Sequence, residues 1–280
     1  MPSGIQGPLP LLDDRKHDEL VKSFRERVPA VLGLDSAEQP RAIVVVSAHW
    51  QTEVATVSSA AAPGLVFDYN GFPPEAYAFK YPAKGDPGLA HEIKQAFEEE
   101  ELAVVLDSDR GWDHGMFVPM TLVRPAADIP IIQLSVLNSE DPNLHIRYGS
   151  ALRKLRDTNV AILGSGFPSF HNLPVIMSMF SGPPDDASLT KIRNDLSEWN
   201  DALTGVVSSP NRDERLAKLE KWRELPNSYF AHPKGAADHF LPLLVCVGAV
   251  DEADGEVKTY SDQFLGVNIL TYYWSPRTVE

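Results

Sequence analysis

Five of the eight histidines in this chain lie beside glycine, proline or the end of an apolar run, outside the helical patterns. They are His49 in VVVSAHW, His114 in RGWDHG, His171 in GSGFPSFHNL, and His232 and His239 in AHPKGAADH. In an α/β protein these are places where a strand ends or a helix begins, and functional sites gather there. Neutral imidazole is the commonest transition-metal ligand and also an acid–base group near neutral pH. The pattern favours a metal site built from histidines.

Each of these histidines alone also has a plain structural interpretation. His49 follows an apolar, β-branched run, where an imidazole can simply bond the backbone. Asp113 is expected to cap a helix that begins at His114, which leaves that ring in a loop or in a cleft. His171 follows a Gly-Ser-Gly turn, whose glycines allow the backbone to approach a ligand closely. His239 is expected in the first turn of an apolar helix, where it faces either a pocket or solvent.

Composition limits the class of partner. The chain has 280 residues, 43% of them hydrophobic, with a net charge of −14 and a pI near 5.0. An acidic surface argues against nucleic acid and anionic membranes, which need a basic face. The one cysteine, Cys246, lies in an apolar run and is expected in the core, and the N-terminus lacks the pattern of a signal peptide. We expect a soluble, cytoplasmic protein that binds a small molecule; whether it forms a homo-oligomer stays open.

Predicted strands and helices alternate along the chain. Strands are expected at 42–50, 55–59, 102–107, 129–136, 159–166, 256–261 and 265–274. Helices are expected at 13–28, 86–98, 114–124, 143–157, within 186–225, and at 238–250. Three histidines in polar helical patterns are predicted to lie at the surface: His17, His91 and His145. The alternation predicts a single α/β domain over residues 1–280, with a central, mixed, mostly parallel sheet and helices on both faces; the two last strands, with no helix between them, favour the mixed form.

Five segments in a fixed order resemble one known family. They are VVVSAHW, YNGFPPEAYAFKYPAKGDPGLA, RGWDHGMFVPM with IPIIQLSV, ILGSG with HNL, and DHFLPLLVCVGA. Together they look like the class III (LigB-type) extradiol ring-cleaving dioxygenases, in particular the branch that includes DOPA 4,5-dioxygenases. The similarity spans nearly the whole chain, and five ordered motifs are far more specific than any one of them.

The resemblance implies a non-haem Fe(II) enzyme, with Zn(II) as the alternative metal, that uses O2 to open a small aromatic diol beside its hydroxyls. It implies that His49 and His239 are metal ligands and that His171 is the acid–base group. His114 would line the substrate pocket, and His232 matches a histidine often present in the last motif. Four aromatic side chains of the long loop either wall that pocket or simply pack the loop: Tyr69, Phe72, Tyr77 and Tyr81.

One departure from the family pattern concerns the start of the chain. Members usually begin with an apolar strand that leads into Ser-His-Gly-Gly-Gly-Pro, whose histidine is another metal ligand, whereas alignment on GPLPLL puts Gly4 at that position. The expectation is a truncated first strand and a two-histidine site that binds metal weakly, unless His232, Asp13, Asp238 or water substitutes. Two alternatives therefore stay open: a catalytically impaired relative that binds a small aromatic ligand, and a zinc hydrolase in which His49 and His239 activate water.

Overall fold

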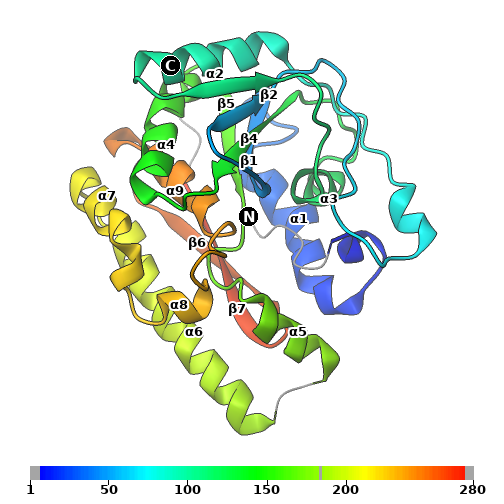
Figure 1. The fold of residues 1–280 in the computed structure, drawn as a ribbon, viewed down its shortest axis with the longest axis vertical. Helices are drawn as coiled ribbons and strands as arrows, with labels where there is room; N and C mark the ends of the chain where they lie inside the picture. Colours follow the sequence, from blue (N-terminus) through cyan, green and yellow to red (C-terminus); the bar gives the residue numbers. More distant parts are fainter. Residues whose placement is uncertain (1–6, 183–184, 275–280) are drawn as a thin grey trace.

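A five-stranded sheet in the order β3-β2-β4-β1-β5 forms the centre of the protein (Figure 1). The structure is a computed structural model that describes residues 7–182 and 185–274. The strands are β1 (Ala42–Thr52), β2 (Ala55–Ser58), β3 (Val104–Asp107), β4 (Ile131–Leu137) and β5 (Val160–Ser165). β4, β1 and β5 run parallel to one another, and β2 pairs parallel with β3 but antiparallel with β4. The predicted single α/β domain with a mixed, mostly parallel sheet is confirmed.

Nine α-helices belong to the described part of the chain. They are α1 (Asp18–Val31), α2 (Pro87–Glu99), α3 (His114–Val123), α4 (Pro142–Arg156), α5 (Leu173–Ser181), α6 (Asp186–Val207), α7 (Arg212–Glu220), α8 (Ser228–Ala231) and α9 (Leu241–Gly248). The sequence patterns did not predict α5 or α8, and the first helix begins later than expected, after two short 3-10 turns. None of the helices among the described residues is both long enough and apolar enough to cross a membrane.

Several helices begin at a side chain that the sequence makes recognisable. Asp86 accepts a hydrogen bond from the backbone N–H of Leu89, and Asp141 does the same for Leu144, each at 3.0 Å. A proline follows directly in both cases, where its missing N–H costs nothing because that group has no partner inside a helix. This chemistry explains why α2 begins after Asp86, as expected, and why α4 begins at Pro142, one residue before the expected start.

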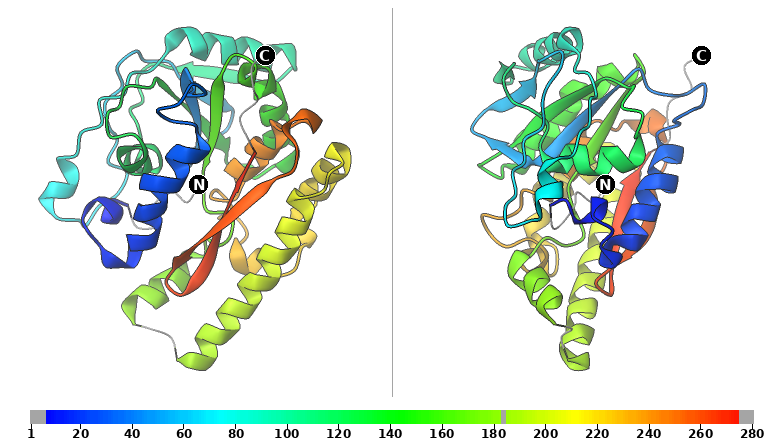
Figure 2. Two further views of the ribbon diagram at one scale, coloured as in Figure 1. Left: turned by 180° about the vertical axis from the view of Figure 1, so that it is seen from behind. Right: turned by 90° about the vertical axis from the view of Figure 1, so that its right-hand side faces the viewer.

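The two faces of the sheet meet different helices, because side chains alternate in direction along each strand. Gly164 of β5 faces α9: a Cβ at this position would lie 2.9 Å from the sulfur of Cys246. Ser165 points the other way and donates a hydrogen bond to the carbonyl of Gly115 in α3. α4 packs against α9 and α2, and α1 backs α3 (Figures 1 and 2). The sheet is thus covered on both faces, as predicted.

The two C-terminal strands do not join the central sheet, which corrects one expectation. β6 (Lys258–Phe264) and β7 (Val267–Tyr273) pair antiparallel with each other in a separate two-stranded sheet (Figure 2). Leu265 and Gly266 connect them with φ angles of 51° and 79°, the left-handed pair that a tight hairpin turn requires. The hairpin packs on α1 and α6. The central sheet is mixed because of β2 and β3, not because of these strands.

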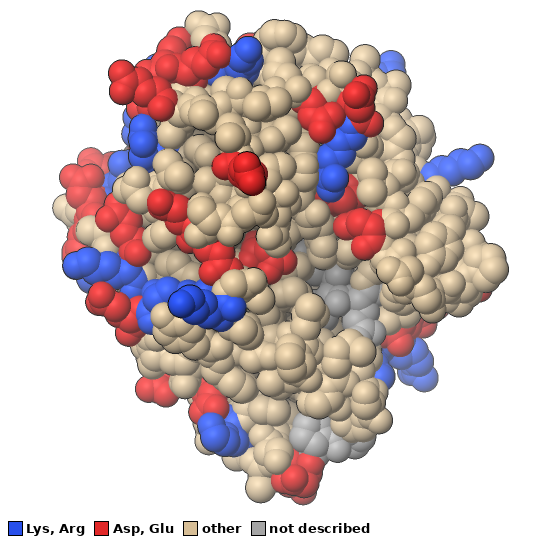
Figure 3. Space-filling view, in the orientation of Figure 1, with Lys and Arg blue, Asp and Glu red and all other residues tan. Residues whose placement is uncertain are grey.

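Among the residues that the structure describes, β5 has a strand neighbour on one side only. A cavity of about 180 Å³ lies between it and β7, and the half-buried Cys246 lines this cavity. The predicted truncation of the first strand concerns the chain before Gly7, and Gly4 itself lies outside the described residues, so that expectation stays a prediction. Acidic side chains are spread over the face shown in Figure 3 among fewer basic ones, in keeping with the net charge of −14.

Two histidines predicted at the surface are buried. His17 bonds Asp14 through Nδ1 at 2.6 Å, and its ring packs against Phe264. His145 donates from Nδ1 to the carbonyl oxygen of Asp141 at 2.6 Å and accepts the backbone N–H of Leu137 at Nε2. The prediction was wrong because the polar helical patterns do not reveal that a hairpin and a strand end cover these rings. His91 is exposed, as expected.

The buried His145 predicts a pH-dependent stability. Burial lowers the pKa of His145 from 6.5 to about 4, so the folded protein keeps this ring neutral while the unfolded chain takes up a proton below pH 6.5. The free energy of unfolding should therefore fall as the pH drops from 6.5 toward 4, with this group contributing up to about 1.4 kcal/mol per pH unit. Urea unfolding of His145→Gln at pH 7, 6 and 5 should give a shallower loss than wild type. The exposed His91→Gln serves as the control and should keep the wild-type slope; equal slopes for all three would contradict the assignment.

Candidate active site

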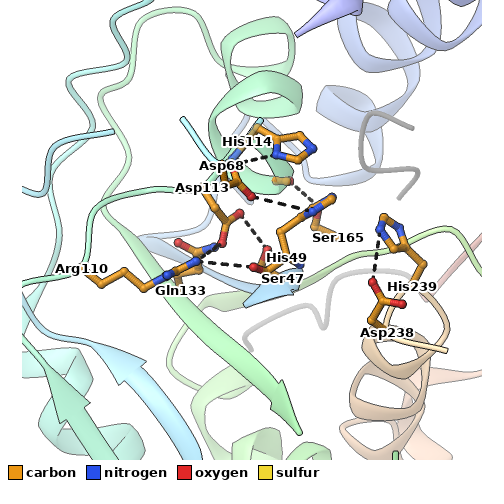
Figure 4. Close-up of polar contacts among 11 residues, drawn as sticks. Ser47, His49, Asp68, Arg110, Asp113, His114, Gln133, Ser165, Asp238 and His239 are labelled. Atoms are coloured by element: carbon orange, nitrogen blue, oxygen red, sulfur yellow. Dashed lines mark hydrogen bonds and ion pairs between the residues drawn. The ribbon is translucent and has the colours of Figure 1, made fainter. Parts of the chain in front are cut away.

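Four of the predicted histidines meet at the carboxyl ends of β1 and β5, although they come from four separate segments. Figure 4 shows three of them, His49, His114 and His239. The ring centroids of His49 and His114 are 3.9 Å apart, those of His49 and His239 are 4.8 Å apart, and those of His171 and His239 are 3.5 Å apart. In open α/β sheets this edge is where ligands bind. The geometry brings together the residues that the sequence singled out, and their chemical roles stay proposals.

His49 lies within β1, in a bulge, and not beyond the end of the strand as the sequence suggested. Ser47 pairs with Ser135 and Gln51 pairs with Val136, so three extra residues of β1 are accommodated within a single step of β4. A bulge of this kind bends a strand and re-aims its side chains, and such bulges are common beside active sites. It turns His49 toward α3 and α9 instead of leaving it in the regular alternation of the sheet.

A network of hydrogen bonds centred on the buried Asp113 holds this bulge in place (Figure 4). Asp113 accepts hydrogen bonds from Ser47 Oγ at 2.8 Å, from Arg110 Nη2 at 3.1 Å and from the amide of Gln133. Burial raises the pKa of the Asp113 carboxyl. The expectation that Asp113 caps α3 is therefore wrong, since its side chain faces the sheet and makes no capping hydrogen bond.

Asp68, and not Asp113, accepts a hydrogen bond at the N-terminus of α3. The sequence analysis did not identify Asp68 as a residue of the site. Its Oδ1 accepts the backbone N–H of His114 at 3.0 Å and the ring Nδ1–H of the same residue at 2.8 Å. Its Oδ2 lies 3.9 Å from Nδ1 of His49. Burial opposes ionisation of Asp68, but its bonds to His114 hold the pKa of this carboxyl below the usual value. The only sequence signal was its place in a loop rich in proline, glycine and aromatic residues.

The other two rings are held by backbone pairing. His239 lies two residues before α9, not inside the helix, and its carbonyl oxygen accepts the N–H of Phe167 at 2.7 Å. The N–H of His171 donates to the carbonyl oxygen of Ala231 at 2.9 Å. Oδ2 of Asp238 lies 3.7 Å from Nε2 of His239, and burial raises the pKa of this carboxyl to about 6.

Three of the rings, those of His49, His171 and His239, are neutral near pH 7. Burial lowers the pKa of His171 to about 3, and burial together with the neighbouring rings holds the pKa of His49 and of His239 well below the usual value. Within the described residues, Nε2 of His49 and Nδ1 of His171 are buried without a hydrogen-bond partner. Unpaired buried nitrogens are rare because they lose the hydrogen bonds of water, and neutral imidazole is the form that binds a metal ion. The donor set therefore fits a transition metal.

Two groups of side chains have ligand atoms close enough to hold an ion. They are His49 with Asp68 and His114, and His171 with Asp238 and His239, and within each group these atoms lie within 4.8 Å of one another. Imidazole with carboxylate suits both iron and zinc.

The remaining candidates are placed differently. His232 is fully buried, bonds the carbonyl oxygen of Pro168 through Nε2 at 2.8 Å, and packs among Trp199, Trp222 and Phe240. It thus belongs to an aromatic cluster and is not one of the four converging rings. Asp13, the other proposed substitute, is exposed on the segment before α1.

The aromatic residues of the long loop divide into two groups. The ring of Tyr69 meets that of His114 edge-on at 5.6 Å, and Phe72 and Tyr77 pack on Tyr69 at 5.4 Å. Tyr81 instead donates from its hydroxyl to the carbonyl oxygen of Arg124 and is buried in the core. Tyr69 is therefore placed to wall the site, whereas Tyr81 has the packing role.

Comparison with known proteins agrees with the geometry and with the family that the sequence motifs predicted. The family described as the catalytic LigB subunit of aromatic ring-opening dioxygenase matches residues 8–271. The dioxygenase tasH of Hapsidospora irregularis is 51% identical over 280 residues, covering 98% of this chain and 84% of that protein. A 4,5-DOPA dioxygenase extradiol of Beta vulgaris is 32% identical over 248 residues, covering 88% of this chain and 84% of the relative.

A solved structure supports the same conclusion. The crystal structure of an uncharacterized protein from Escherichia coli K12 superposes with a TM-score of 0.66 at 25% identity, covering 90% of this chain and 91% of that one. The agreement therefore extends from short motifs to the path of the backbone. Because the family match spans far more than half of its length, the chain belongs to the LigB family of aromatic ring-opening dioxygenases.

Proposed function

We propose that this protein is a non-haem Fe(II)-dependent extradiol dioxygenase that opens a catechol such as DOPA beside its two hydroxyls. The observation that carries the proposal is the convergence of four histidines, with the rings of His49 and His239 only 4.8 Å apart. Several relatives bear the name 4,5-DOPA dioxygenase extradiol, among them those from Beta vulgaris and Escherichia coli at 32% and 31% identity, which supports DOPA as the first substrate to test.

His49 and His239 are the residues that would hold the ion. They come from β1 and from the segment before α9, so the ion would link two elements that lie far apart in the sequence. When bound, Fe(II) lowers the pKa of catechol hydroxyls and activates dioxygen. Because Zn(II) prefers similar ligands but has no redox chemistry, the same residues would also bind zinc without supporting ring opening.

His171 is proposed to move a proton. Its ring is stacked on that of His239, so a diol that reaches His239 also comes within reach of His171. A neutral ring can take the proton of a catechol hydroxyl, and the anionic oxygen left beside it stabilises the imidazolium. The same nitrogen can return the proton to the opened product.

His114 and Tyr69 would form the opposite wall. His114 faces His49 and is fixed through Nδ1, which leaves its other nitrogen for a polar atom of the substrate. The edge of Tyr69 offers an aromatic surface next to it. A flat ring with two adjacent hydroxyls matches such a site, which has polar groups on one side and an aromatic wall on the other.

The proposal is tested by loading the apo-protein anaerobically with Fe(II), adding DOPA or unsubstituted catechol, and then admitting O2. We expect stoichiometric O2 uptake and a yellow ring-opened product with at least one of the two diols. The same protein loaded with Zn(II) should bind metal and consume no O2. Iron-loaded protein that consumes no O2 with either diol would overturn the proposal and favour the impaired relative.

The acid–base role of His171 predicts a separation of turnover from metal binding. His171→Ala should keep the metal affinity of wild type, because this ring is not one of the two ligands, yet it should lower kcat by about 100-fold or more. Metal content after dialysis and O2 uptake measure the two effects separately. The exposed His91→Ala is the matched control and should change neither. Loss of bound metal in His171→Ala would show that the acid–base assignment is wrong.

The ring of His49 lies directly against Gly115, so a side chain added at Gly115 should disturb metal binding by His49. A Cβ at this position would approach Cδ2 of His49 to 2.5 Å, closer than real contacts allow, so Gly115→Ala must push the ring aside. We expect Zn(II) affinity, measured by competition with a chromophoric chelator, to fall at least about 10-fold, the lower end of the effect of disturbing a metal site from its surroundings. Gly64→Ala meets nothing within 4 Å and should bind as wild type does. An unchanged affinity in Gly115→Ala would argue against His49 as a ligand.

A further inference from the structure

One carboxylate, that of Asp68, is hydrogen-bonded to one of the four converging histidines and lies beside a second. Oδ1 of Asp68 takes two hydrogen bonds from His114, one from the ring at 2.8 Å and one from the backbone at 3.0 Å. Oδ2 lies 3.9 Å from Nδ1 of His49. The loop that carries Asp68 is itself fixed, because the N–H of Val66 donates to the carbonyl oxygen of Trp112 at 2.7 Å. The carboxylate is thus attached to the start of α3 and not to a free loop.

The contact with His114 determines which ring nitrogen carries the proton. An ionised carboxylate only accepts hydrogen bonds, so Nδ1 of His114 must be the donor. In a neutral ring Nε2 then has the lone pair and can accept a hydrogen bond from a hydroxyl in the site. The backbone bond has a second effect, since it satisfies the first N–H of α3, a group that has no partner within the helix.

The contact with His49 concerns the metal. Nε2 of His49 is buried and has no hydrogen-bond partner in the described part of the chain, so it is the nitrogen available to an ion, and Nδ1 must then carry the proton. Ligating histidines usually direct that second N–H to a carboxylate or a carbonyl oxygen, which fixes the ring and raises its basicity. Oδ2 of Asp68 is the carboxylate oxygen on that side of the ring.

We propose that Asp68 is the positioning residue of the site, holding His114 as a hydrogen-bond acceptor toward the substrate and orienting His49 toward the metal. The proposal rests on the metal and substrate roles given above. Asp68 can act on both histidines because one of its carboxylate oxygens faces the ring of His114 and the other faces the ring of His49. Asp113, the neighbouring buried carboxylate, bonds Ser47, Arg110 and Gln133 instead.

The two tasks can be separated by substitution. Asp68→Ala removes both oxygens. Asp68→Asn keeps one oxygen, which the two N–H groups of His114 should retain on their side, and puts an NH2 group opposite the N–H of His49. A matched control exists elsewhere in the chain: Asp14 bonds Nδ1 of the buried His17 at 2.6 Å, so Asp14→Ala removes a histidine–carboxylate pair of the same kind outside the site.

Two measurements are made on each protein without substrate. Long-range ¹H–¹⁵N correlation spectra of metal-free protein with ¹⁵N-labelled histidine report which ring nitrogen carries the proton, with His114→Gln used to assign the His114 signals. Competition with a chromophoric chelator gives the affinity for Zn(II). The protonated nitrogen of His114 would not change if Asp68 merely stabilised the loop, and the Asp14→Ala control separates a general loss of stability from a local effect on metal affinity.

The expected results differ for each variant. Wild type and Asp14→Ala should show His114 in the Nδ1–H form and bind Zn(II) equally. Asp68→Ala should give a mixture of His114 tautomers and bind Zn(II) about 10–100-fold more weakly. Asp68→Asn should keep the His114 tautomer and lose about 10-fold in affinity. Because the asparagine side chain has nearly the same shape, this variant carries the test if Asp68→Ala does not fold.

The proposal is overturned if Asp68→Ala keeps the wild-type tautomer and a Zn(II) affinity within about twofold of wild type. It is equally overturned if Asp14→Ala weakens metal binding as strongly as Asp68→Ala does, since the effect would then be one of stability. The proposed dioxygenase activity fails in a different way, through absence of O2 uptake by iron-loaded wild type. That outcome would leave the tautomer result standing.

Discussion

Four imidazole rings lie close together at one edge of the sheet, and metal binding there depends on neutral rings at His49, His171 and His239. A proton on any of them would lose its hydration and would repel the others, because neighbouring rings lie 3.5–4.8 Å apart between centroids. Burial is the largest influence that lowers the pKa values of His49, His171 and His239. Neutral rings are also the form that binds a transition metal. The same burial that keeps protons away therefore prepares the site for a divalent cation, which the nitrogen lone pairs stabilise directly.

Main-chain hydrogen bonds, and not contacts between the imidazole rings, hold the four histidines close together. β1 carries His49 into position through a bulge, β5 ends in the turn that leads to His171, and the segment before α9 pairs with the residues that follow β5. Each ring is thus attached to a different strand or helix end at one edge of the sheet. Because hydrogen bonds of the main chain fix these ends, the rings remain close together even though they attract one another only weakly.

Much of this fold follows from local chemistry that a sequence carries openly. Apolar, β-branched runs mark β1, β4 and β5, and Asp86 and Asp141 before prolines mark the starts of α2 and α4. What was missed or mistaken depends on partners distant in sequence. The C-terminal strands pair with each other because a left-handed turn joins them, and His17 and His145 are buried because a hairpin and a strand end happen to cover them. In the site, the histidines could be selected by residue type and family motif, whereas Asp68 is recognisable only once the loop is seen against α3.

Asp113 and Asp68 lie beside the same histidines but differ in burial and in partners, because Asp113 is buried whereas Asp68 is partly open to solvent. Asp113 is paired with Arg110, and the guanidinium of Arg110 also lies 4.7 Å from the ring centroid of Trp50, within the bulge. This unit is close to neutral overall, so it joins β1 to the start of α3 without adding net charge beside the rings. Asp68 is instead bonded to N–H groups of His114, and its negative charge lies at the N-terminus of α3, where the helix dipole stabilises it. Asp113 therefore stabilises the fold around the bulge. Asp68 places a net negative charge beside His49, and this charge favours the binding of a cation there.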